Sequence, residues 1–236
     1  MPDAIHFTGD PDADALLARD PLALLIGFAL DQQVTVQQAF AGPLRIQQRL
    51  GTLDAARIAA TDPGRLEEVF RERPAIHRFP GSMAKRVQAL CGLVADEYDG
   101  DASRLWTEAK DGNDLEQRIR ALPGFGDMKV LSLSAVLWKR LGVEVARPLA
   151  PDFPTLGDVD SVEALEAYQA AKRAYRSARR GEATKARSSP TASSERPPHV
   201  GPVLHGCRGR QHSRFGNGLV GDKVKIALEI SAILQT

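Results

Sequence analysis

Residues 119–130 read IRALPGFGDMKV, and this stretch decides the fold that we expect for the chain. Its centre, Leu122-Pro123-Gly124-Phe125-Gly126, lies between two segments whose apolar residues recur at helical spacing. Glycines in such a turn can adopt positive φ and leave room for another molecule against the backbone. Amide groups of the turn and of the following helix can then bind a phosphate. The stretch predicts two helices joined by a phosphate-binding hairpin, although a plain helix–helix corner has a similar sequence.

The segments around this turn read as a succession of helices, with hardly any of the alternating β-branched pattern that predicts strands. Asp20-Pro21 is a strong helix start, because aspartate caps the free amide groups and proline fits the first helical position. The apolar run over residues 22–30 then predicts a buried helix. Further helices are expected over residues 34–50 with a break at Gly42-Pro43, over 54–60, from Asp62, from Ser82, from Asn113 to Leu122, over about 126–141 and from Ser161.

Composition narrows the class of protein. The chain has 236 residues, of which 43% are hydrophobic, so it can bury the core of one or two domains. No stretch approaches the roughly 20 apolar residues of a membrane span, and the chain begins with acidic residues, unlike a signal peptide. Two cysteines, Cys91 and Cys207, are too few for a disulfide framework, a cysteine-ligated zinc site or a four-cysteine iron–sulfur cluster. We therefore expect a cytoplasmic protein with no membrane partner.

The net charge of +1 conceals two opposite parts of the chain. Residues 1–171 hold 18 Lys and Arg against 26 Asp and Glu, a net charge of −8, and residues 172–236 hold 13 against 4, a net charge of +9. After Gly181 the chain is polar and rich in Ser and Pro, which is typical of disorder. The final residues have no evident relation to the helical body, and a shifted reading frame would produce such an ending. We expect a helical domain over residues 1–160, a basic helix over 161–180 and a disordered or unassigned tail over 181–236.

Three stretches resemble one known family in their order and spacing. They are DPLALLIGFALDQQVTVQQA (Asp20–Ala39), FPGSMAKRVQAL (Phe79–Leu90) and IRALPGFGDMKV (Ile119–Val130). Together they are similar to the helix-hairpin-helix DNA glycosylase superfamily, HhH-GPD, which includes endonuclease III and the 3-methyladenine DNA glycosylases. The resemblance covers residues 20–143, a little over half of the chain.

The resemblance implies an all-α fold of two helical lobes with a cleft between them, followed in this chain by a disordered basic C-terminal tail. Members of the family flip a damaged base out of the duplex and cut its N-glycosidic bond. Hairpin residues Leu122, Gly124 and Gly126 would bind the DNA backbone, in some members with a monovalent cation at the hairpin carbonyls, and Lys129 would add a positive charge. No iron–sulfur cluster and no other cofactor is expected.

One hairpin position separates the two classes of enzyme in this family. Bifunctional members, which also cut the strand as lyases, place a lysine two residues after the second hairpin glycine, where this chain has Met128. Lys129 is the next residue, about 100° further round the helix, and should point away from that pocket as an exposed or phosphate-facing cation. We therefore expect a monofunctional DNA glycosylase, a hydrolase that uses water and has no lyase activity.

The lesion pocket and the catalytic acid also follow from the resemblance. Gln32 and Gln33 match the glutamines that border the lesion. A carboxylate after the hairpin helix would stabilise the positive charge that builds up on the sugar. The usual Val-Asp-Thr sequence is absent, so Asp152, in Leu-Ala-Pro-Asp, is the candidate and Glu144 is the fallback. Without this acid the chain would be a non-catalytic DNA-binding helix-hairpin-helix protein, and that alternative stays open.

These inferences together describe a base-excision repair protein. We expect a monomer that acts on alkylated or deaminated bases in double-stranded DNA and that, in a bacterium, associates with the nucleoid. A helical scaffold with no role at nucleic acid is the remaining alternative, because the helical body is acidic. The basic tail would add non-specific affinity for DNA. The local cations expected to meet phosphate are Arg118, Lys129, Lys139 and Arg140.

Overall fold

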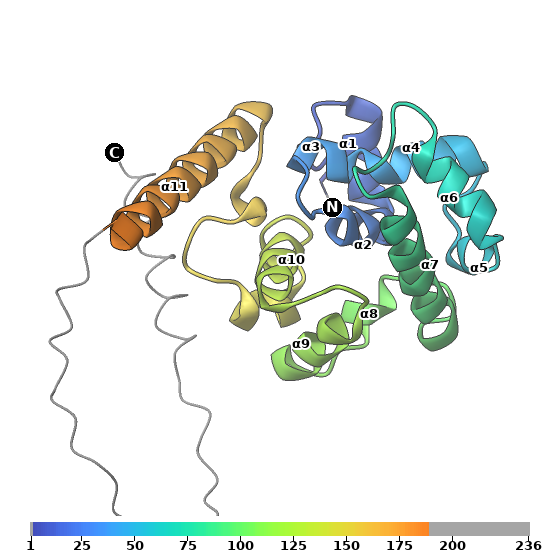
Figure 1. The fold of residues 1–236 in the computed structure, drawn as a ribbon. Helices are drawn as coiled ribbons and strands as arrows, with labels where there is room; N and C mark the ends of the chain where they lie inside the picture. Colours follow the sequence, from blue (N-terminus) through green and yellow to red (C-terminus); the bar gives the residue numbers. More distant parts are fainter. Residues whose placement is uncertain (1, 189–236) are drawn as a thin grey trace, which may run out of the picture. The chain divides into compact units, whose positions relative to one another are not determined.

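The computed structural model of the protein describes residues 2–188, and this part of the chain is all-α, without a β-strand. The chain divides into two units, Met1–Gln169 and Ala170–Thr236, and the boundary falls within α11. The elements of the described residues are, in order (Figure 1), α1 (Pro11–Arg19), α2 (Pro21–Leu30), α3 (Val36–Phe40), α4 (Gly42–Leu50), α5 (Ala55–Ala59), α6 (Pro63–Arg71), α7 (Pro80–Glu97), α8 (Arg104–Thr107), α9 (Gly112–Ala121), α10 (Asp127–Lys139), the 3-10 helices η1 (Glu144–Leu149) and η2 (Leu156–Asp158), and α11 (Val162–Ser188).

Aspartate caps begin several helices at the positions that the sequence predicted. The Oδ1 atom of Asp20 accepts hydrogen bonds from Leu22 N at 2.9 Å and Ala23 N at 3.2 Å. Asp54 and Asp62 cap α5 and α6 in the same manner. Each cap binds amide groups that have no partner within the helix, which stabilises a helix by about 1 kcal/mol. The predicted starts of α2, α5 and α6 are confirmed.

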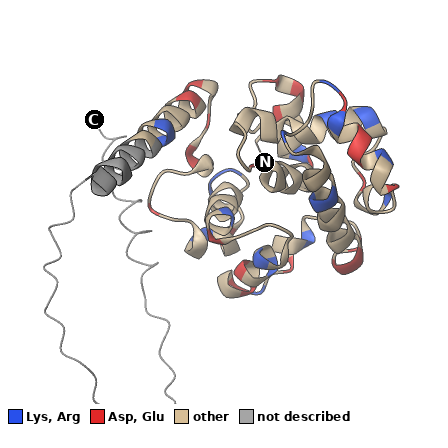
Figure 2. Ribbon diagram, viewed as in Figure 1, with Lys and Arg blue, Asp and Glu red and all other residues tan. Residues whose placement is uncertain are grey.

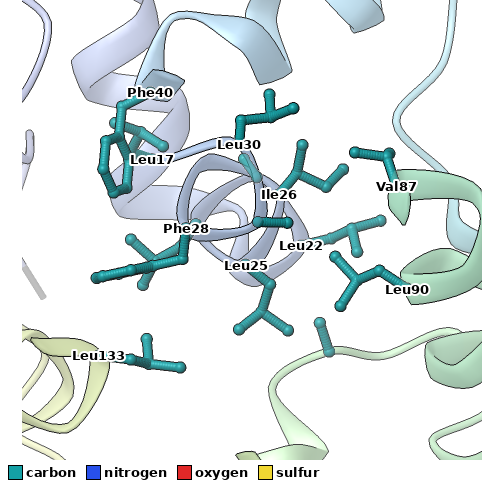
Figure 3. Packing of buried hydrophobic residues seen from close by; sticks show 14 of the residues in the cluster. Leu17, Leu22, Leu25, Ile26, Phe28, Leu30, Phe40, Val87, Leu90 and Leu133 are labelled. Carbon is teal, nitrogen blue, oxygen red and sulfur yellow. The ribbon is translucent and has the colours of Figure 1, made fainter. Parts of the chain in front are cut away.

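Helix α2 lies at the centre of the core, as its apolar sequence predicted. Residues 22–30 are all buried. Figure 3 shows their side chains pointing outward on every side of the helix, toward Phe40, toward Val87 and Leu90 of α7, and toward Leu133 of α10. A helix that is apolar all round can be stable in water only when other elements cover all of its faces.

The closely packed pairs of elements fall into two sets. In the first set, α2 packs against α1, α3, α4 and α7, and α7 packs against α5 and α6. In the second set, α10 packs against α9, η1 and η2, and α9 also packs against α8. One continuous core, which includes Phe28 of α2 and Leu133 of α10, joins them. The turn between α9 and α10 therefore belongs to the second set, and the loop after α2 belongs to the first.

Several helix boundaries differ from the sequence prediction. Helix α1 was not predicted. The break predicted within residues 34–50 is present, between α3 and α4, but it falls at Ala41, just before Gly42-Pro43. Helix α7 begins at Pro80 and not at Ser82, because proline already fits the first helical position. Helix α9 begins after Asp111, whose Oδ1 accepts a hydrogen bond from Asp114 N at 2.9 Å, and Asn113 lies inside the first turn.

The chain after α10 is more regular than expected. Residues 143–159, over which no helix was predicted, contain η1 and η2. Helix α11 begins after Ser161 as predicted but continues past Arg180 to Ser188, so residues 181–188 are helical where a disordered tail was expected. Most residues of that stretch, Glu, Ala, Lys and Arg, favour helices, and the Ser/Pro-rich sequence begins only at its end. The rest of the predicted tail, residues 189–236, lies outside the described residues.

Candidate nucleic-acid interface

A tight turn joins α9 to α10, as the opening stretch of sequence predicted. Leu122 N donates a hydrogen bond to Ile119 O at 3.2 Å where α9 ends, and Phe125 N donates to Leu122 O at 3.1 Å, which closes the turn. Leu122 and Phe125 are both buried, so two apolar side chains hold the turn against the core. Gly124 adopts a φ of 82°, in the left-handed region that favours glycine. Phosphate binding by this turn stays a prediction.

The two glycines of the turn have different surroundings. A Cβ atom on Gly124 would lie 2.8 Å from Nε of Arg86, so this arginine of α7 packs directly against the turn. Gly126 has a φ of −102° and a ψ of −176°, an extended conformation that any residue adopts, and a Cβ atom there would meet nothing within 4 Å. The expected positive φ therefore occurs at Gly124 and not at Gly126. Arg86 is a neighbour of the turn that the sequence pattern did not identify as such.

The first turn of α10 carries a negative charge beside the amide groups that would face a phosphate. Asp127 is the first residue of α10, and its Oδ1 lies 2.5 Å from Nη1 of Arg120. Arg120 also pairs with Glu116 at 2.6 Å. An acidic residue at a helix N-terminus is favourable for the helix dipole but repels a phosphate. Arg120 offsets part of this repulsion.

Met128 and Lys129 point in different directions, as expected for successive residues of a helix. The Met128 side chain is 53% exposed. The Lys129 side chain is half-buried: its Nζ donates a hydrogen bond to Ala29 O of α2 at 3.3 Å and lies 5.2 Å from the ring centre of Phe125. Lys129 was expected to be exposed or to face phosphate, and it is turned inward because α2 lies beside this face of α10. A contact with the DNA backbone stays a prediction.

Burial changes the acidity of Lys129. Its pKa falls from 10.5 to about 8, chiefly because the half-buried ammonium group has lost water. The carboxylate of Asp31, just after α2, opposes this change, and the guanidinium of Arg86 adds to it. A substantial fraction of Lys129 is therefore the neutral amine at slightly alkaline pH.

The loop after α2 carries both predicted lesion-side glutamines. Gln32 N donates a hydrogen bond to Leu30 O at 2.7 Å, which bends the chain sharply as α2 ends. Gln33 has a φ of 57° and its side chain is exposed, whereas Gln32 is half-buried. A left-handed conformation costs a residue other than glycine about 1–2 kcal/mol and is often found at functional sites. Thr35 then caps α3 through a hydrogen bond from Gln38 N at 3.2 Å.

His77 connects this loop to the chain before α7. Its side chain is completely buried, and its Nε2 lies 2.9 Å from Gln32 O. Phe79 N donates to Nδ1 at 3.0 Å. Because Nδ1 accepts a hydrogen bond, the ring proton is on Nε2, which donates to the Gln32 carbonyl. Loss of water on burial lowers the pKa of His77 from 6.5, so the neutral ring is the stable form at neutral pH.

Asp152 and Glu144, the two candidates for the catalytic acid, lie in the segment that follows α10. Glu144 is the first residue of η1, and Asp152 lies in the loop between η1 and η2. Both side chains are exposed. The nearby Asp158 is instead fixed by Lys139 Nζ at 2.6 Å and by Thr155 N at 2.8 Å, and these groups lower its pKa although burial opposes them. Among the described residues, neither candidate carboxylate is thus buried in a pocket where it would be held for catalysis.

Most of the local cations that were expected to meet phosphate are engaged within the protein. Arg118 pairs with Asp114 at 3.2 Å and donates to Glu108 O at 3.1 Å. Lys139 pairs with Asp158, and Arg140 donates to Gly157 O at 2.9 Å. Figure 2 shows basic and acidic positions interspersed over the described helices. With these three cations engaged, any phosphate contact depends on the turn and on individual arginines such as Arg86.

The hairpin turn and the glutamine loop lie at adjoining elements. Lys129 extends from the first turn of α10 to Ala29 in the last turn of α2, and Gln32 and Gln33 follow that turn. Arg86 links α7 to the other side of the hairpin at Gly124. The structure thus brings the hairpin close to the loop after α2 that holds the predicted glutamines, whereas Asp152 and Glu144 lie exposed in the chain after α10.

Three further observations bear on ligands and relatives. Within residues 2–188, His, Cys, Asp and Glu side chains form no group of three or more that could hold a metal ion. The helices of this part of the chain are also too short or too polar to cross a membrane. No protein-family model, curated protein or solved structure matches the chain.

Proposed function

We propose that the protein is a DNA base-excision repair protein of the helix-hairpin-helix type, a monofunctional DNA glycosylase that hydrolyses the N-glycosidic bond of an alkylated or deaminated base. Double-stranded DNA is its partner, and no cofactor takes part beyond a monovalent cation at the hairpin carbonyls. The fold is proposed to be the two-lobed HhH-GPD arrangement, with the α1–α7 set and the α8–η2 set as its two lobes. The proposal places the protein with the DNA, as a monomer in the cytoplasm.

One observation carries the proposal. The hydrogen bond from Lys129 Nζ to Ala29 O brings the start of α10 to the end of α2, so the hairpin lies beside the loop that holds Gln33. Gly124 has the left-handed backbone that allows a tight turn, and Gln33 is exposed in a left-handed conformation of its own. A turn that can bind the DNA backbone, next to an exposed polar side chain, is the arrangement that a base-flipping enzyme needs, because it must hold the duplex while it contacts one base pair.

The side chains around the hairpin favour hydrolysis over the lyase reaction. Met128, two residues after Gly126, has no amine, and Lys129 donates its hydrogen bond into the protein at Ala29 O. Water is then the nucleophile, and Asp152 is proposed to stabilise the positive charge on the sugar and to orient this water. An exposed loop carboxylate can take that position when DNA covers it.

A second function is favoured by one specific observation. Asp152 and Glu144 are both exposed, and an acid that is not held in place is a weak basis for catalysis. On this alternative the chain is a non-catalytic helix-hairpin-helix protein that binds duplex DNA. Both functions require the hairpin, and only the glycosylase requires the acid.

The two functions are separated by base release at stoichiometric protein concentration. The full chain is incubated with end-labelled duplexes that contain uracil, hypoxanthine or a methylated purine, and alkali then cuts the strand at any abasic site. The glycosylase predicts strand cuts after alkali on at least one duplex, and absence of cuts on every duplex, with binding retained, would favour the non-catalytic protein.

Asp152→Asn tests the role of the acid, with Asp160→Asn as its control. Both positions are exposed carboxylates in the chain after α10. Asp152→Asn should lower the single-turnover rate of base release by at least about a hundredfold, since one well-placed charge contributes several kcal/mol to such a transition state. Asp160→Asn should leave the rate unchanged. Equal rates for the two variants would remove Asp152 from the mechanism.

A further inference from the structure

A single imidazole ring connects two loops that are far apart in the sequence. His77 belongs to the loop between α6 and α7, and its side chain is 0% exposed. Its Nε2 donates to Gln32 O, 2.9 Å away in the loop after α2, and its Nδ1 accepts from Phe79 N at 3.0 Å. Both ring nitrogens are therefore used, one in each loop. One side chain thus supplies the hydrogen-bond partner of a backbone carbonyl, Gln32 O, and of a backbone amide, Phe79 N.

The residue beside this contact is the one with the unusual backbone. Gln33 has a φ of 57°, and an exposed glutamine side chain cannot by itself stabilise a left-handed conformation. Such a conformation persists only where the surrounding structure determines it. The preceding residue, Gln32, has its N–H bonded to Leu30 O at 2.7 Å and its C=O bonded to His77. Both backbone groups of Gln32 are therefore fixed immediately before the bend.

We propose that His77 is a positioning residue for the lesion side of the site: its neutral ring fixes Gln32, so that the exposed Gln33 side chain meets the target base pair in a single orientation. This inference rests on the proposed function. His77 does not touch DNA, because its ring is completely covered by protein. It acts through the Gln32 carbonyl, and its effect is to reduce the entropy lost when Gln33 contacts the duplex.

The surroundings of His77 make this role dependent on pH. The charged groups acting on the ring are Arg78 in the same loop and Arg86 on α7, both positive. The carbonyls of Leu30, the last residue of α2, and of Gln32 in the loop after it also act on the ring. Burial lowers the pKa of His77 from 6.5, the two carbonyls oppose this change, and the two arginines add to it. The neutral ring is thus kept at pH 6.5 and above. Protonation at lower pH would add a hydrogen to Nδ1 and break the bond from Phe79 N.

The test compares His77→Gln and His77→Leu in the full chain, with His6→Gln as a control at a half-buried histidine. Glutamine can still donate to the Gln32 carbonyl and cannot be protonated, whereas leucine fills similar space without a hydrogen bond. Steady-state base release is measured over a range of duplex concentrations from pH 5 to 8, which gives kcat and KM, and circular dichroism and thermal unfolding verify that each variant is folded.

The positioning role predicts three results. His77→Leu lowers kcat by about tenfold or more while KM changes little, because orientation and not attraction is lost. His77→Gln keeps kcat within about threefold of the wild type, as does the control His6→Gln, because glutamine still donates to the Gln32 carbonyl. A folded His77→Leu with wild-type kcat, or a folded His77→Gln as slow as His77→Leu, would overturn the inference.

Amide hydrogen exchange of residues 31–35 gives a readout that needs no reaction. These amides should exchange about tenfold faster in His77→Leu than in the wild type, because the hydrogen bond to Gln32 O is lost. The amide of Phe79 loses its acceptor as well and should also exchange faster, whereas α5 and α6 should not change. Unchanged exchange would overturn the positioning role even in an active enzyme. Faster exchange combined with no base release by the wild type would instead refute the proposed function and leave the contact between the loops established.

Discussion

Replacement of Lys129 by methionine should stabilise the protein at neutral pH. The Lys129 ammonium is half-buried between α10 and α2, and burial lowers its pKa from 10.5 to about 8. One pKa unit corresponds to about 1.4 kcal/mol, so the charged form is disfavoured by about 3 kcal/mol relative to the unfolded chain. Screening by solvent and the loss of the hydrogen bond to Ala29 O reduce this gain. We expect Lys129→Met to raise the free energy of unfolding by about 1–2 kcal/mol at pH 7.

The stability difference between Lys129→Met and the wild type should depend on pH, and the direction of this dependence can be predicted without knowing the size of the difference. Because the folded pKa of Lys129 is lower than the unfolded value, the cost of the charge is complete below pH 8, decreases between pH 8 and 10.5, and is absent above. The advantage of Lys129→Met should therefore shrink as the pH rises. Cys91, whose pKa burial raises to about 12, and Tyr98, whose pKa burial also raises, titrate alike in both proteins and cancel in the difference.

Urea unfolding at pH 7, 8.5 and 10 measures this difference, with Lys85→Met as the control. Lys85 is exposed on α7, so its replacement should change stability by no more than about 0.5 kcal/mol at any of these pH values. A Lys129→Met protein that is less stable than the wild type at pH 7, or a stability difference independent of pH, would show that Lys129 is not buried between α10 and α2.

Three other predictions concern the core and the hairpin. Gly27→Ala should destabilise the protein by about 1–3 kcal/mol in urea unfolding, because its Cβ would lie 2.8 Å from Cε1 of the buried Phe40 ring; a neutral result would mean that this ring can move aside. Gly124→Ala should weaken duplex binding in fluorescence anisotropy, because φ is 82° there and alanine disfavours that conformation. Gly126→Ala should bind normally, because Gly126 has an extended backbone and open space around it. Equal effects of the two substitutions would contradict the turn geometry. Asp127→Asn should tighten duplex binding by about threefold at low salt and less at high salt, since it removes a negative charge beside the hairpin, and a loss of affinity would argue against phosphate at the start of α10.

The helices could be predicted wherever a local signal marks them. Asp20, Asp54 and Asp62 each place an acceptor beside free amide groups, and this chemistry depends only on neighbouring residues. The buried helix over residues 22–30 was predictable because no other environment suits such an apolar run. Where two caps compete, as with Asp111 and Asn113, the sequence does not decide, since either side chain can accept the same kind of hydrogen bond.

The contacts of the candidate site could not be predicted in this way. The direction of Lys129 relative to Met128 follows from helix geometry, but the presence of α2 beside it depends on the packing of the two sets of helices. His77 and Gln32 are in contact across 45 positions of sequence, and no local pattern reports such a contact. Arg86 behind Gly124 is a case of the same kind. Side chains that form contacts between loops far apart in the sequence can therefore be identified only after the fold is known.

The most direct test of the central claim is a time course of base release by the full-length protein, in which each sample is divided and analysed with and without alkali. The proposed function predicts that strand cuts at the lesion accumulate in the alkali-treated half and are absent from the untreated half, because a monofunctional glycosylase leaves an intact abasic strand. Cuts of equal extent in both halves would show a lyase and would contradict the assignment of water as the nucleophile. No cuts in either half, on any damaged duplex at stoichiometric protein, would contradict the proposal that this chain is a DNA glycosylase.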